Sequence, residues 1–260
     1  MPSECATRII VIIPTYNERQ NIARLIPQVM ETDTRLHVLV VDDASEDGTA
    51  GEVLNYQQKN WPQRLHLYSR QKKLGLGSAY VDGFNWGLSK KYDFLIQMDG
   101  DLSHNPTYLA AMLQCAGQAD FVVGSRYVTG GGTRNWGMGR RYLSRFGSFY
   151  ARKALQVRFS DFTGGFNGWT SNVLRKIGLN EIRSNGYSFQ IELKYRAYKM
   201  GFKHVEFPIV FVDRKTGKSK MSTAIALEAM WRVWQLRFFM RALLQNPSNR
   251  NRSIVDCLSK

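Results

Sequence analysis

Three short hydrophobic runs in the N-terminal part of the chain each end in a polar stretch. The runs and the stretches after them are 9–13 before Pro14-Thr-Tyr-Asn-Glu18, 38–41 before Asp42-Asp-Ala-Ser45, and 94–98 before Asp99-Gly-Asp101. Runs that are apolar throughout, rather than alternating, are typical of parallel strands covered on both faces. Such strands direct their carboxyl ends into one crevice, where ligands bind. We therefore expect Tyr16, Glu18, Asp43, Asp99 and Asp101 to converge in space.

The segments between these runs have helical spacing. Residues 21–31 place Ile22, Leu25, Ile26 and Val29 on one helix face. The pattern predicts further helices over residues 48–58, 77–89 and 106–115, and further strands over residues 65–68 and 120–124. This alternation predicts the α/β class, with a mostly parallel sheet flanked by helices.

The chain has the size and hydrophobic content of one α/β domain. It has 260 residues, 43% of them hydrophobic, and no Gly/Ser/Pro-rich linker precedes Arg214. We expect one domain over residues 1–223 and a C-terminal appendage over residues 224–260. The N-terminus carries only a brief apolar run, so we expect no signal peptide or spanning helix there. The cysteines lack metal-binding spacing and are odd in number, which fits a reducing compartment.

Residues 224–244 are mostly apolar but do not resemble a membrane-spanning helix, because charged residues interrupt them: Glu228, Arg232, Arg237 and Arg241. One helical face would carry Leu227, Trp231, Trp234 and Phe238. This segment is either an interfacial helix lying on a membrane or a helix packed on the domain. The polar residues 246–260 are expected to be disordered.

The chain is strongly basic, with a formal net charge of +15 and a pI near 9.9. Residues 134–158 contain no acidic residue and interleave arginines and lysine with the aromatic side chains of Trp136, Tyr142, Phe146, Phe149 and Tyr150. A cationic and aromatic segment suits an RNA groove, where bases stack on rings. It also suits a surface that rests on anionic lipid headgroups.

The chemistry of Asp99 and Asp101 depends on what surrounds them. Carboxylate oxygens are suitable ligands for magnesium or manganese, and magnesium is commonly held by one or two carboxylates together with substrate phosphates. The alternative is a solvated turn, since this pattern also occurs in surface loops.

Several ordered motifs resemble those of glycosyltransferase family 2, and most closely those of its polyprenyl (dolichyl) phosphate mannose synthases. They are Pro14-Thr-Tyr-Asn-Glu18, Asp42-Asp-Ala-Ser-Glu-Asp-Gly-Thr49, Leu74-Gly-Leu-Gly-Ser-Ala79, Asp99-Gly-Asp-Leu-Ser-His104, Gly124-Ser-Arg-Tyr127, Asp161-Phe-Thr-Gly-Gly-Phe166 and Asp213-Arg-Lys-Thr-Gly-Lys-Ser-Lys-Met221. The resemblance runs from Ile9 to Met221. It implies the GT-A fold and a divalent cation, Mg²⁺ or Mn²⁺, as cofactor.

By this resemblance, the nucleotide sugar would be bound by Pro14, Tyr16, Glu18, Val41, Asp43, Asp99, Gly100, Asp101, Arg126, Arg214 and Lys220. The metal would be held by Asp101 and Asp99, helped by Ser103, where the family often has Gln. Asp42 either shares in binding or satisfies backbone donors of its own turn. The two glycines after Leu74 are interpreted as turn and helix-start residues rather than a phosphate cradle.

Arg126, Arg140 and Ser144 match positions that contact the acceptor phosphate, although Arg140 and Ser144 also fit a basic surface helix. Arg214 and Lys220 lie in a charged loop of the kind that closes over a donor diphosphate. The family usually has Arg where this chain has Asn167, so one expected cation is missing or supplied elsewhere.

No general base is required if the acceptor is a phosphate, which is largely anionic at neutral pH. Asp99, Asp101 and Glu192 are base candidates only for an alcohol acceptor. His104, near the metal motif, is interpreted as structural.

The resemblance implies an inverting transfer of mannose from GDP-mannose to polyprenyl phosphate, catalysed with Asp101, Arg126, Arg214 and Lys220. It favours a membrane surface over nucleic acid as the partner of residues 134–158. The expected location is cytoplasmic, peripheral on the cytosolic face of a membrane, reached by the protein itself or through a membrane-protein partner. The alternatives are transfer of glucose or another sugar and, from a different class, a nucleic-acid-binding module.

Overall fold

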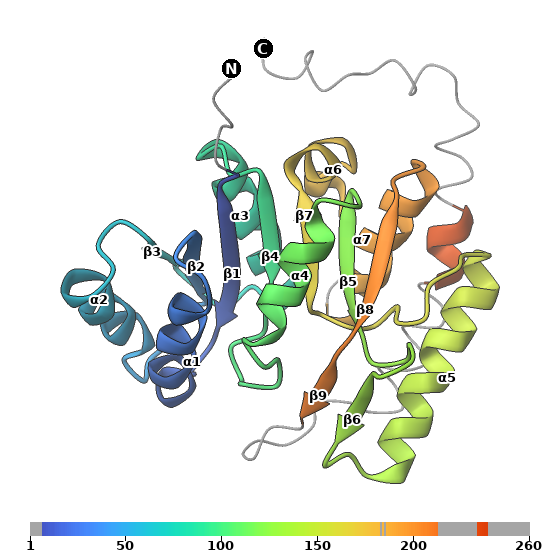
Figure 1. The fold of residues 1–260 in the computed structure, drawn as a ribbon, viewed down its shortest axis with the longest axis horizontal. Coiled ribbons are helices and arrows are strands. Elements are labelled where there is room, and N and C mark those ends of the chain that lie inside the picture. The colour runs from blue at the N-terminus through green and yellow to red at the C-terminus, as the bar shows by residue number, and fades with distance from the viewer. Residues whose placement is uncertain (1–6, 183, 185, 213–232, 239–260) are drawn as a thin grey trace.

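The computed structural model describes residues 7–182, 184, 186–212 and 233–238, without the side chains of Arg140 and Tyr187. A seven-stranded sheet in the order β3-β2-β1-β4-β7-β5-β8 forms its centre (Figure 1). These strands are β1 (Ile9–Thr15), β2 (Leu36–Asp42), β3 (Leu65–Ser69), β4 (Phe94–Gln97), β5 (Phe121–Ser125), β7 (Asn167–Thr170) and β8 (His204–Pro208). The predicted α/β class and mostly parallel sheet are confirmed.

The uninterrupted hydrophobic strands contribute side chains to two cores, one on each face of the sheet. Ile9, Val11 and Ile13 pack with α1 (Arg19–Thr32), α2 (Thr49–Lys59) and α4 (Tyr108–Ala116). Ile10 and Ile12 face the other way, toward α3 (Leu76–Ser89), α6 (Ser171–Lys176) and α7 (Tyr187–Lys199). Successive side chains of a strand point to opposite faces, so a strand covered on both must be apolar at every position.

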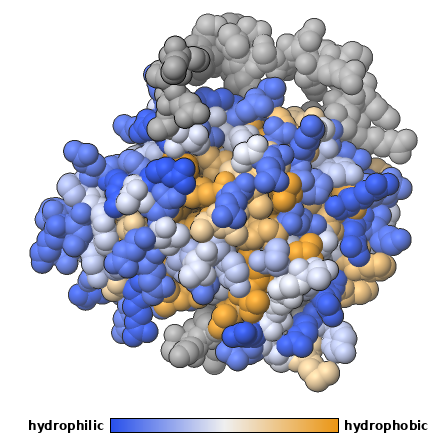
Figure 2. All heavy atoms as spheres, in the orientation of Figure 1, coloured by the Kyte–Doolittle hydropathy of each residue, from blue (hydrophilic) through white to orange (hydrophobic). Residues whose placement is uncertain are grey.

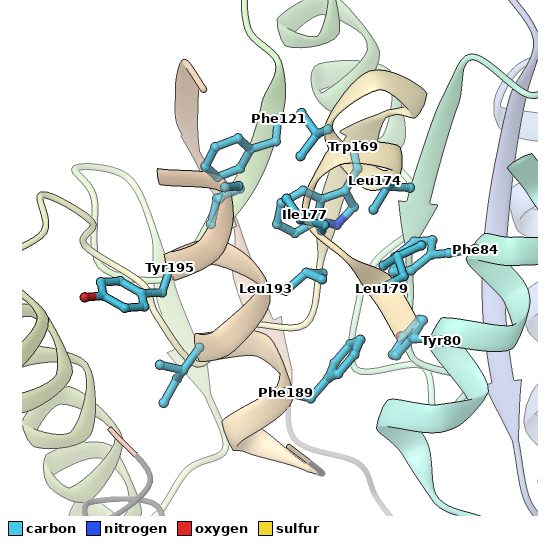
Figure 3. Packing of buried hydrophobic residues seen from close by; sticks show 14 of the residues in the cluster. Tyr80, Phe84, Phe121, Trp169, Leu174, Ile177, Leu179, Phe189, Leu193 and Tyr195 are labelled. Carbon is cyan, nitrogen blue, oxygen red and sulfur yellow. The ribbon is translucent and has the colours of Figure 1, made fainter. Parts of the chain in front are cut away.

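Aromatic rings dominate the second of these cores. Trp169 of β7 stacks on Phe121 of β5, with ring centroids 5.0 Å apart. Phe189 of α7 stacks on Tyr80 of α3 at 6.0 Å, almost parallel (Figure 3). The second pair matters for the site, because the Tyr80 hydroxyl points to the end of β4.

Strand β7 is antiparallel to both of its neighbours, β4 and β5. Its first residue, Asn167, therefore pairs with Gln97, the last residue of β4. The loop that precedes β7, residues 161–166, is thus brought to the edge where the parallel strands end. The sequence patterns gave no indication of this strand.

A small extension lies below that edge in Figure 1. Its parallel strands are β6 (Gly132–Arg134) and β9 (Val210–Val212), followed along the chain from β6 by the long helix α5 (Met138–Leu155). A short 3-10 helix, η1 (Leu179–Glu181), precedes α7. The face shown in Figure 2 gathers hydrophobic residues near its centre, with hydrophilic residues around them. Among the described helices, none combines the length and apolar character needed to cross a membrane.

Residues 233–238 are helical and lie against α5. Val233 and Leu236 join the hydrophobic core, and an Arg237 Nη1 donates to the Ala154 carbonyl at 2.7 Å. Trp234 and Phe238 remain exposed and stack on each other. This part of the appendage therefore packs on the domain while presenting aromatic rings outward; the remainder of residues 224–260 lies outside the described residues, and the proposed boundary at residue 223 stays a prediction.

A histidine cluster lies near the starts of β2 and β3, at the end of the sheet opposite to the carboxyl ends of these strands. His37 of β2 shares a 2.8 Å hydrogen bond with the Tyr92 hydroxyl and stacks on His66 of β3. Burial, together with the nearby His66, Arg8 and Arg64, lowers the pKa of His37 to about 4. The folded protein therefore resists protonation of this ring.

We expect this cluster to make the protein sensitive to acid. An unfolded histidine has a pKa of about 6.5, so the stability contributed by neutral His37 is complete above that pH and is lost as the pH falls toward 4. In urea titrations, His37→Gln should lose about 1 kcal/mol less unfolding free energy than the parent between pH 7 and pH 4.5, allowing for solvent screening. Parallel pH profiles would contradict this.

Candidate active site

The ends of β2, β1 and β4 lie side by side, because these strands are adjacent and parallel. Pro14 pairs with Val41 across β1 and β2. A methyl group added at Gly100 would lie 3.2 Å from the Pro14 carbonyl oxygen, so the turn after β4 packs directly on β1. Val41 itself is fully buried beneath α3. The predicted convergence of these strand ends is present.

Small polar side chains join the loops after β1 and β2. Asp42 accepts hydrogen bonds from the hydroxyls of Thr15 and Ser45, at 2.9 and 2.6 Å, and from the Ser45 amide. The Asn17 amide donates to the Ser45 hydroxyl, and the Glu18 amide donates to the Thr49 hydroxyl. Asp42 thus satisfies its own turn, which is the structural alternative considered for it.

Each loop also holds a residue other than glycine at positive φ. These residues are Asn17 (57°) after β1, Ala44 (59°) after β2 and Leu102 (62°) after β4. Side chains with a Cβ rarely adopt this region, and asparagine tolerates it best. Strain of this kind commonly collects at functional sites because the surrounding contacts are strong enough to maintain it.

Asp43 is held by the loop before α3. Its carboxylate accepts the Leu74 and Gly75 amides at 2.9–3.1 Å and pairs with Arg70 at 3.1 Å. Arg70 also pairs with Asp82 of α3 at 3.2 Å. Gly75 has a φ of 97° and precedes the first residue of α3, so the predicted helix start is confirmed. The backbone amides of Leu74 and Gly75 therefore bind a carboxylate of the protein itself, that of Asp43.

Tyr16 and Glu18 flank this region from the loop after β1. Tyr16 is exposed, and Lys73 Nζ lies 3.5 Å from the centre of its ring. Glu18 precedes α1 and accepts a hydrogen bond from the Asn21 side chain. An exposed ring under a cation next to a carboxylate provides stacking and hydrogen-bonding groups suited to a nucleoside.

Asp99 is positioned by two buried groups. The Tyr80 hydroxyl donates to its Oδ1 at 3.1 Å, and burial followed by the charge of Asp99 raises the pKa of Tyr80 well above its usual value. His104 Nδ1 accepts the Asp99 amide at 3.2 Å and packs between Phe166 and Phe211. Burial lowers the pKa of His104. His104 is thus a buried structural ring, as interpreted from the sequence.

Asp101 follows in the same turn, with Oδ1 accepting the Ser103 amide at 3.1 Å. The Ser103 hydroxyl oxygen is buried and has no hydrogen bond in the described part of the chain. No cluster of three or more potential metal ligands occurs among the described His, Cys, Asp and Glu residues. Two hard carboxylates nevertheless fit magnesium or manganese, provided that water and substrate phosphates complete the shell.

Arg126 follows β5 at the same edge and is paired with Asp161. Nε and Nη2 each lie 2.7 Å from a carboxylate oxygen, and Nη2 also donates to the Thr163 hydroxyl at 2.8 Å. Burial alone would raise the pKa of Asp161, but the charge and hydrogen bonds of Arg126 bring it to about 2. Arg126 thus reaches the predicted edge, with part of its guanidinium committed to Asp161.

A buried lysine supports the same loop. Lys194 Nζ donates to the carbonyls of Asp161, Phe162 and Gly164, at 2.8–3.4 Å. Burial lowers the pKa of Lys194 to about 8, although Asp161 opposes that shift. Glu206 of β8 accepts the Ser160 and Asp161 amides. The loop that precedes β7 is therefore fixed from three elements.

Asn167 is fully buried, so its position faces the interior rather than the crevice. Its Nδ2 lies 3.1 Å from Gln97 Oε1, from Gln190 Oε1 and from the Gly164 carbonyl. The family usually has an arginine at this position, and position 167 of this chain carries an uncharged asparagine instead. Gln190 and Lys194 were missed by sequence reasoning; the polar residues within the amphipathic run of α7 were the only signal available.

The predicted acceptor residues lie on or near α5. Ser144 accepts a 2.7 Å hydrogen bond from the Tyr127 hydroxyl, while the Arg140 side chain, Arg214 and Lys220 lie outside the described residues. Glu192, a base candidate for alcohols, is buried and pairs with Arg196 at 2.8 Å. The carboxylate of Glu192 therefore has a structural ion-pair partner within α7, Arg196.

The sequence matches the family model described as glycosyl transferase family 2 over residues 10–178. The chain belongs to this family. It is 44% identical over 233 residues to polyprenol monophosphomannose synthase of Mycolicibacterium smegmatis, covering 88% of each chain. It is 42% identical over 226 residues to undecaprenyl-phosphate mannosyltransferase of Micrococcus luteus, covering 87% of this chain and 92% of that one.

Solved structures of similar fold include two glycosyltransferase complexes. Glucosyl-3-phosphoglycerate synthase from Mycobacterium tuberculosis, with Mn²⁺, UDP and glucosyl-3-phosphoglycerate, has a TM-score of 0.63 at 16% identity, covering 91% of this chain and 80% of that one. The mannosyltransferase PcManGT from Pyrobaculum calidifontis, with GDP-Man and Mn²⁺, has a TM-score of 0.60 at 20% identity, covering 92% and 65%. The GT-A fold is thereby confirmed for this family 2 glycosyltransferase.

The Arg126–Asp161 pair should be essential for stability. Asp161→Asn removes the negative charge that pairs with the buried guanidinium, and breaking such a pair typically costs about 3–5 kcal/mol. Urea denaturation should show a loss of this size. The control is Asp33→Asn, which breaks the 2.7 Å pair with the largely exposed Arg35 and should cost about 1 kcal/mol or less. Equal losses in the two variants would contradict the role given to Asp161.

Proposed function

We propose that this glycosyltransferase moves mannose from GDP-mannose to a polyprenyl phosphate. The observation that carries the proposal is a carboxylate pair at the end of β4, facing the β1 and β2 loops, in a chain 44% identical to a polyprenol monophosphomannose synthase. The mannosyltransferase name of the second relative, at 42% identity, supports the same sugar.

Asp101 and Asp99 would hold a divalent cation, which neutralises the charge that grows on the leaving diphosphate. Asp99 is already oriented by Tyr80, and Asp101 by the Ser103 amide. A contact through Ser103 requires its buried hydroxyl to turn outward. Arg214 and Lys220 remain the proposed cations that cover the diphosphate.

The nucleoside would bind between the loops after β1 and β2. Tyr16 offers an exposed ring, and Glu18 offers carboxylate oxygens for ribose or base. Pro14, Val41 and Gly100 shape the floor through close backbone packing. Asp43 contributes by holding the 74–75 backbone in place, since Leu74, Gly75 and Arg70 surround its carboxylate.

The acceptor phosphate would approach from the side of Arg126 and α5. A phosphate monoester is mostly doubly ionised at neutral pH and can attack without a general base. Ser144 accepts from Tyr127, which leaves its own hydroxyl hydrogen available to donate to a phosphate oxygen. The burial of Glu192 against Arg196 agrees with a reaction that needs no base there.

A peripheral location on the cytosolic face of a membrane would bring the lipid acceptor to α5. This helix exposes Met138, Tyr142, Phe146 and Phe149, spaced so that they share one side. Arginines and a lysine accompany them, and α5 contains no acidic residue. An apolar side flanked by cations is suited to the interface of anionic lipids.

Removing Asp101 should abolish transfer while leaving the fold intact. We expect Asp101→Ala to lower turnover of radiolabelled GDP-mannose onto polyprenyl phosphate at least 100-fold, because the diphosphate loses its metal-mediated neutralisation. Chelation of Mg²⁺ should lower parent turnover comparably. Parallel assays with GDP-glucose and UDP-glucose test the sugar and the base. Full activity of Asp101→Ala, or of chelated parent, would overturn the metal role.

Membrane binding should depend on the exposed aromatic side of α5. Tyr142→Ser with Phe146→Ser is expected to reduce flotation with vesicles containing anionic lipid about tenfold or more, since both rings lose their apolar contact. Leu54→Ser with Met200→Ser, two exposed apolar residues in α2 and directly after α7, serves as the control. Salt should weaken parent binding. Unchanged flotation of the α5 variant would exclude this surface, and tight RNA binding by the parent would favour a nucleic-acid partner.

A further inference from the structure

Tyr127 connects the end of β5 with helix α5. It follows Arg126 directly in the chain, and its hydroxyl lies 2.7 Å from the Ser144 hydroxyl of α5. Burial raises the pKa of Tyr127, and the charges of Arg126 and Arg145 only partly oppose that shift, so the hydroxyl keeps its proton at neutral pH. Because a phenol is a stronger acid than an alcohol, Tyr127 is the donor in this bond and Ser144 is the acceptor.

The ring of Tyr127 also contacts two guanidinium groups. The guanidinium carbon of Arg126 lies 5.2 Å from the ring centre, and that of Arg145 lies 5.8 Å from it. Both distances are typical of cation–π contacts. Arg126 is buried and paired with Asp161, whereas Arg145 is an exposed residue of α5. Two cations and one serine hydroxyl, from two separate elements, are therefore gathered around one aromatic side chain.

The two cations are not equally available to a ligand. Asp161 balances the charge of Arg126 through a buried, bidentate pair. Arg145 has no hydrogen bond or ion pair to the residues that the structure describes, and the sequence of α5 contains no acidic residue that would neutralise it. A guanidinium binds phosphate oxygens strongly and in a defined geometry. The exposed charge of Arg145 is therefore the one suited to an anionic ligand.

Ser144 keeps its own hydroxyl hydrogen for another partner. It accepts from Tyr127 and donates to none of the residues that the structure describes, and its half-buried position leaves it within reach of solvent. Hydrogen bonds in a chain polarise one another, so accepting from Tyr127 makes Ser144 a stronger donor. A donor hydroxyl followed in the chain by an exposed guanidinium matches a phosphate group, whose ionised oxygens only accept.

We propose that Tyr127 orients Ser144 toward the phosphate of the acceptor, and that Arg145 supplies a cation to the same phosphate. This inference rests on the proposed transfer to a polyprenyl phosphate and adds a positioning residue and a binding residue to it. Tyr127 acts through Ser144 and does not itself touch the substrate. Because Tyr127 directly follows the buried Arg126, it ties α5 to the edge of the sheet where the parallel strands end.

Steady-state kinetics of the full chain test these roles, with GDP-mannose and a short-chain prenyl phosphate that dissolves without a membrane. Tyr127→Phe keeps the ring and its cation contacts but removes the hydroxyl. Ser144→Ala removes the group that Tyr127 orients, and Arg145→Gln removes the exposed charge. Each should raise the KM for the prenyl phosphate about tenfold and change kcat less than twofold, because acceptor binding loses a hydrogen bond or a charge. The Kd for GDP-mannose, by calorimetry, should stay within twofold.

A double variant distinguishes a positioning role from a general structural effect. If Tyr127 acts through Ser144, Tyr127→Phe with Ser144→Ala should have about the same KM for the prenyl phosphate as either single variant. Independent effects would instead multiply to about a hundredfold. A hundredfold rise would overturn the positioning role of Tyr127.

Two control variants make the same chemical changes elsewhere. Tyr56→Phe removes a hydroxyl of α2 that donates to the Ala23 carbonyl of α1 at 3.0 Å, and Arg24→Gln removes the charge of an exposed arginine of α1. Both should keep the parent KM for the prenyl phosphate. Thermal unfolding of every variant identifies a loss of fold. If Tyr127→Phe unfolds, Ser144→Ala decides, because it leaves the Tyr127 side chain in place.

The phosphate of an anionic lipid headgroup has the same chemistry as that of the acceptor, and vesicle flotation separates the two. An unchanged KM for the prenyl phosphate in folded Tyr127→Phe or Arg145→Gln would overturn the role of that residue. If these variants lose only flotation with anionic vesicles, the groups bind a headgroup, and the inference is overturned as well. A parent that transfers no mannose to the prenyl phosphate would refute the proposed function itself, and this inference with it.

Discussion

The buried pairing of Arg126 with Asp161 holds together the half of the site that β7 creates. Arg126 belongs to the end of β5, and Asp161 belongs to the loop that precedes β7. Lys194 of α7 and Glu206 of β8 bind the backbone of the same loop. Taking the charges of Arg126 and Asp161 out of water is costly, and their pairing and hydrogen bonds compensate for it. The loop therefore has one arrangement, and Gly165 lies opposite Asp99 because of it.

The other half of the site is held in a different way. Short polar side chains after β1 and β2 hydrogen-bond one another and maintain Asn17 and Ala44 at positive φ. The Asp43 carboxylate ties this half to the start of α3. Asp99 lies between the two halves, oriented by Tyr80 from α3 and adjoining Gly165 from the β7 loop. Groups fixed before the substrate arrives are what electrostatic stabilisation of a leaving diphosphate requires.

The environment gives similar carboxylates different tasks. Asp42, Asp43, Asp99 and Asp101 all lie at or just after the ends of buried strands, yet Asp42 completes a turn and Asp43 anchors a loop. Asp99 and Asp101 remain in the partly exposed turn after β4, where a cation and phosphates can reach them. The sequence motifs place all four at one edge of the sheet. Their hydrogen-bond partners separate the structural roles of Asp42 and Asp43 from the binding roles that we propose for Asp99 and Asp101.

The sequence by itself determined the alternating strands and helices up to β5, since continuous apolar runs and helical spacing are local properties. It also determined which edge of the sheet carries the candidate site and that the glycines after Leu74 lie at a turn and the start of a helix. Only the tertiary structure decided the insertion of β7, the partner of Arg126, the burial of Asn167 and the direction of Gln190. Each of these depends on contacts between segments far apart in the chain, such as Arg126 with Asp161 and Gln190 with Asn167. The local sequence pattern does not indicate such contacts, because the antiparallel insertion of β7 and the pairing of charges depend on how distant segments pack together.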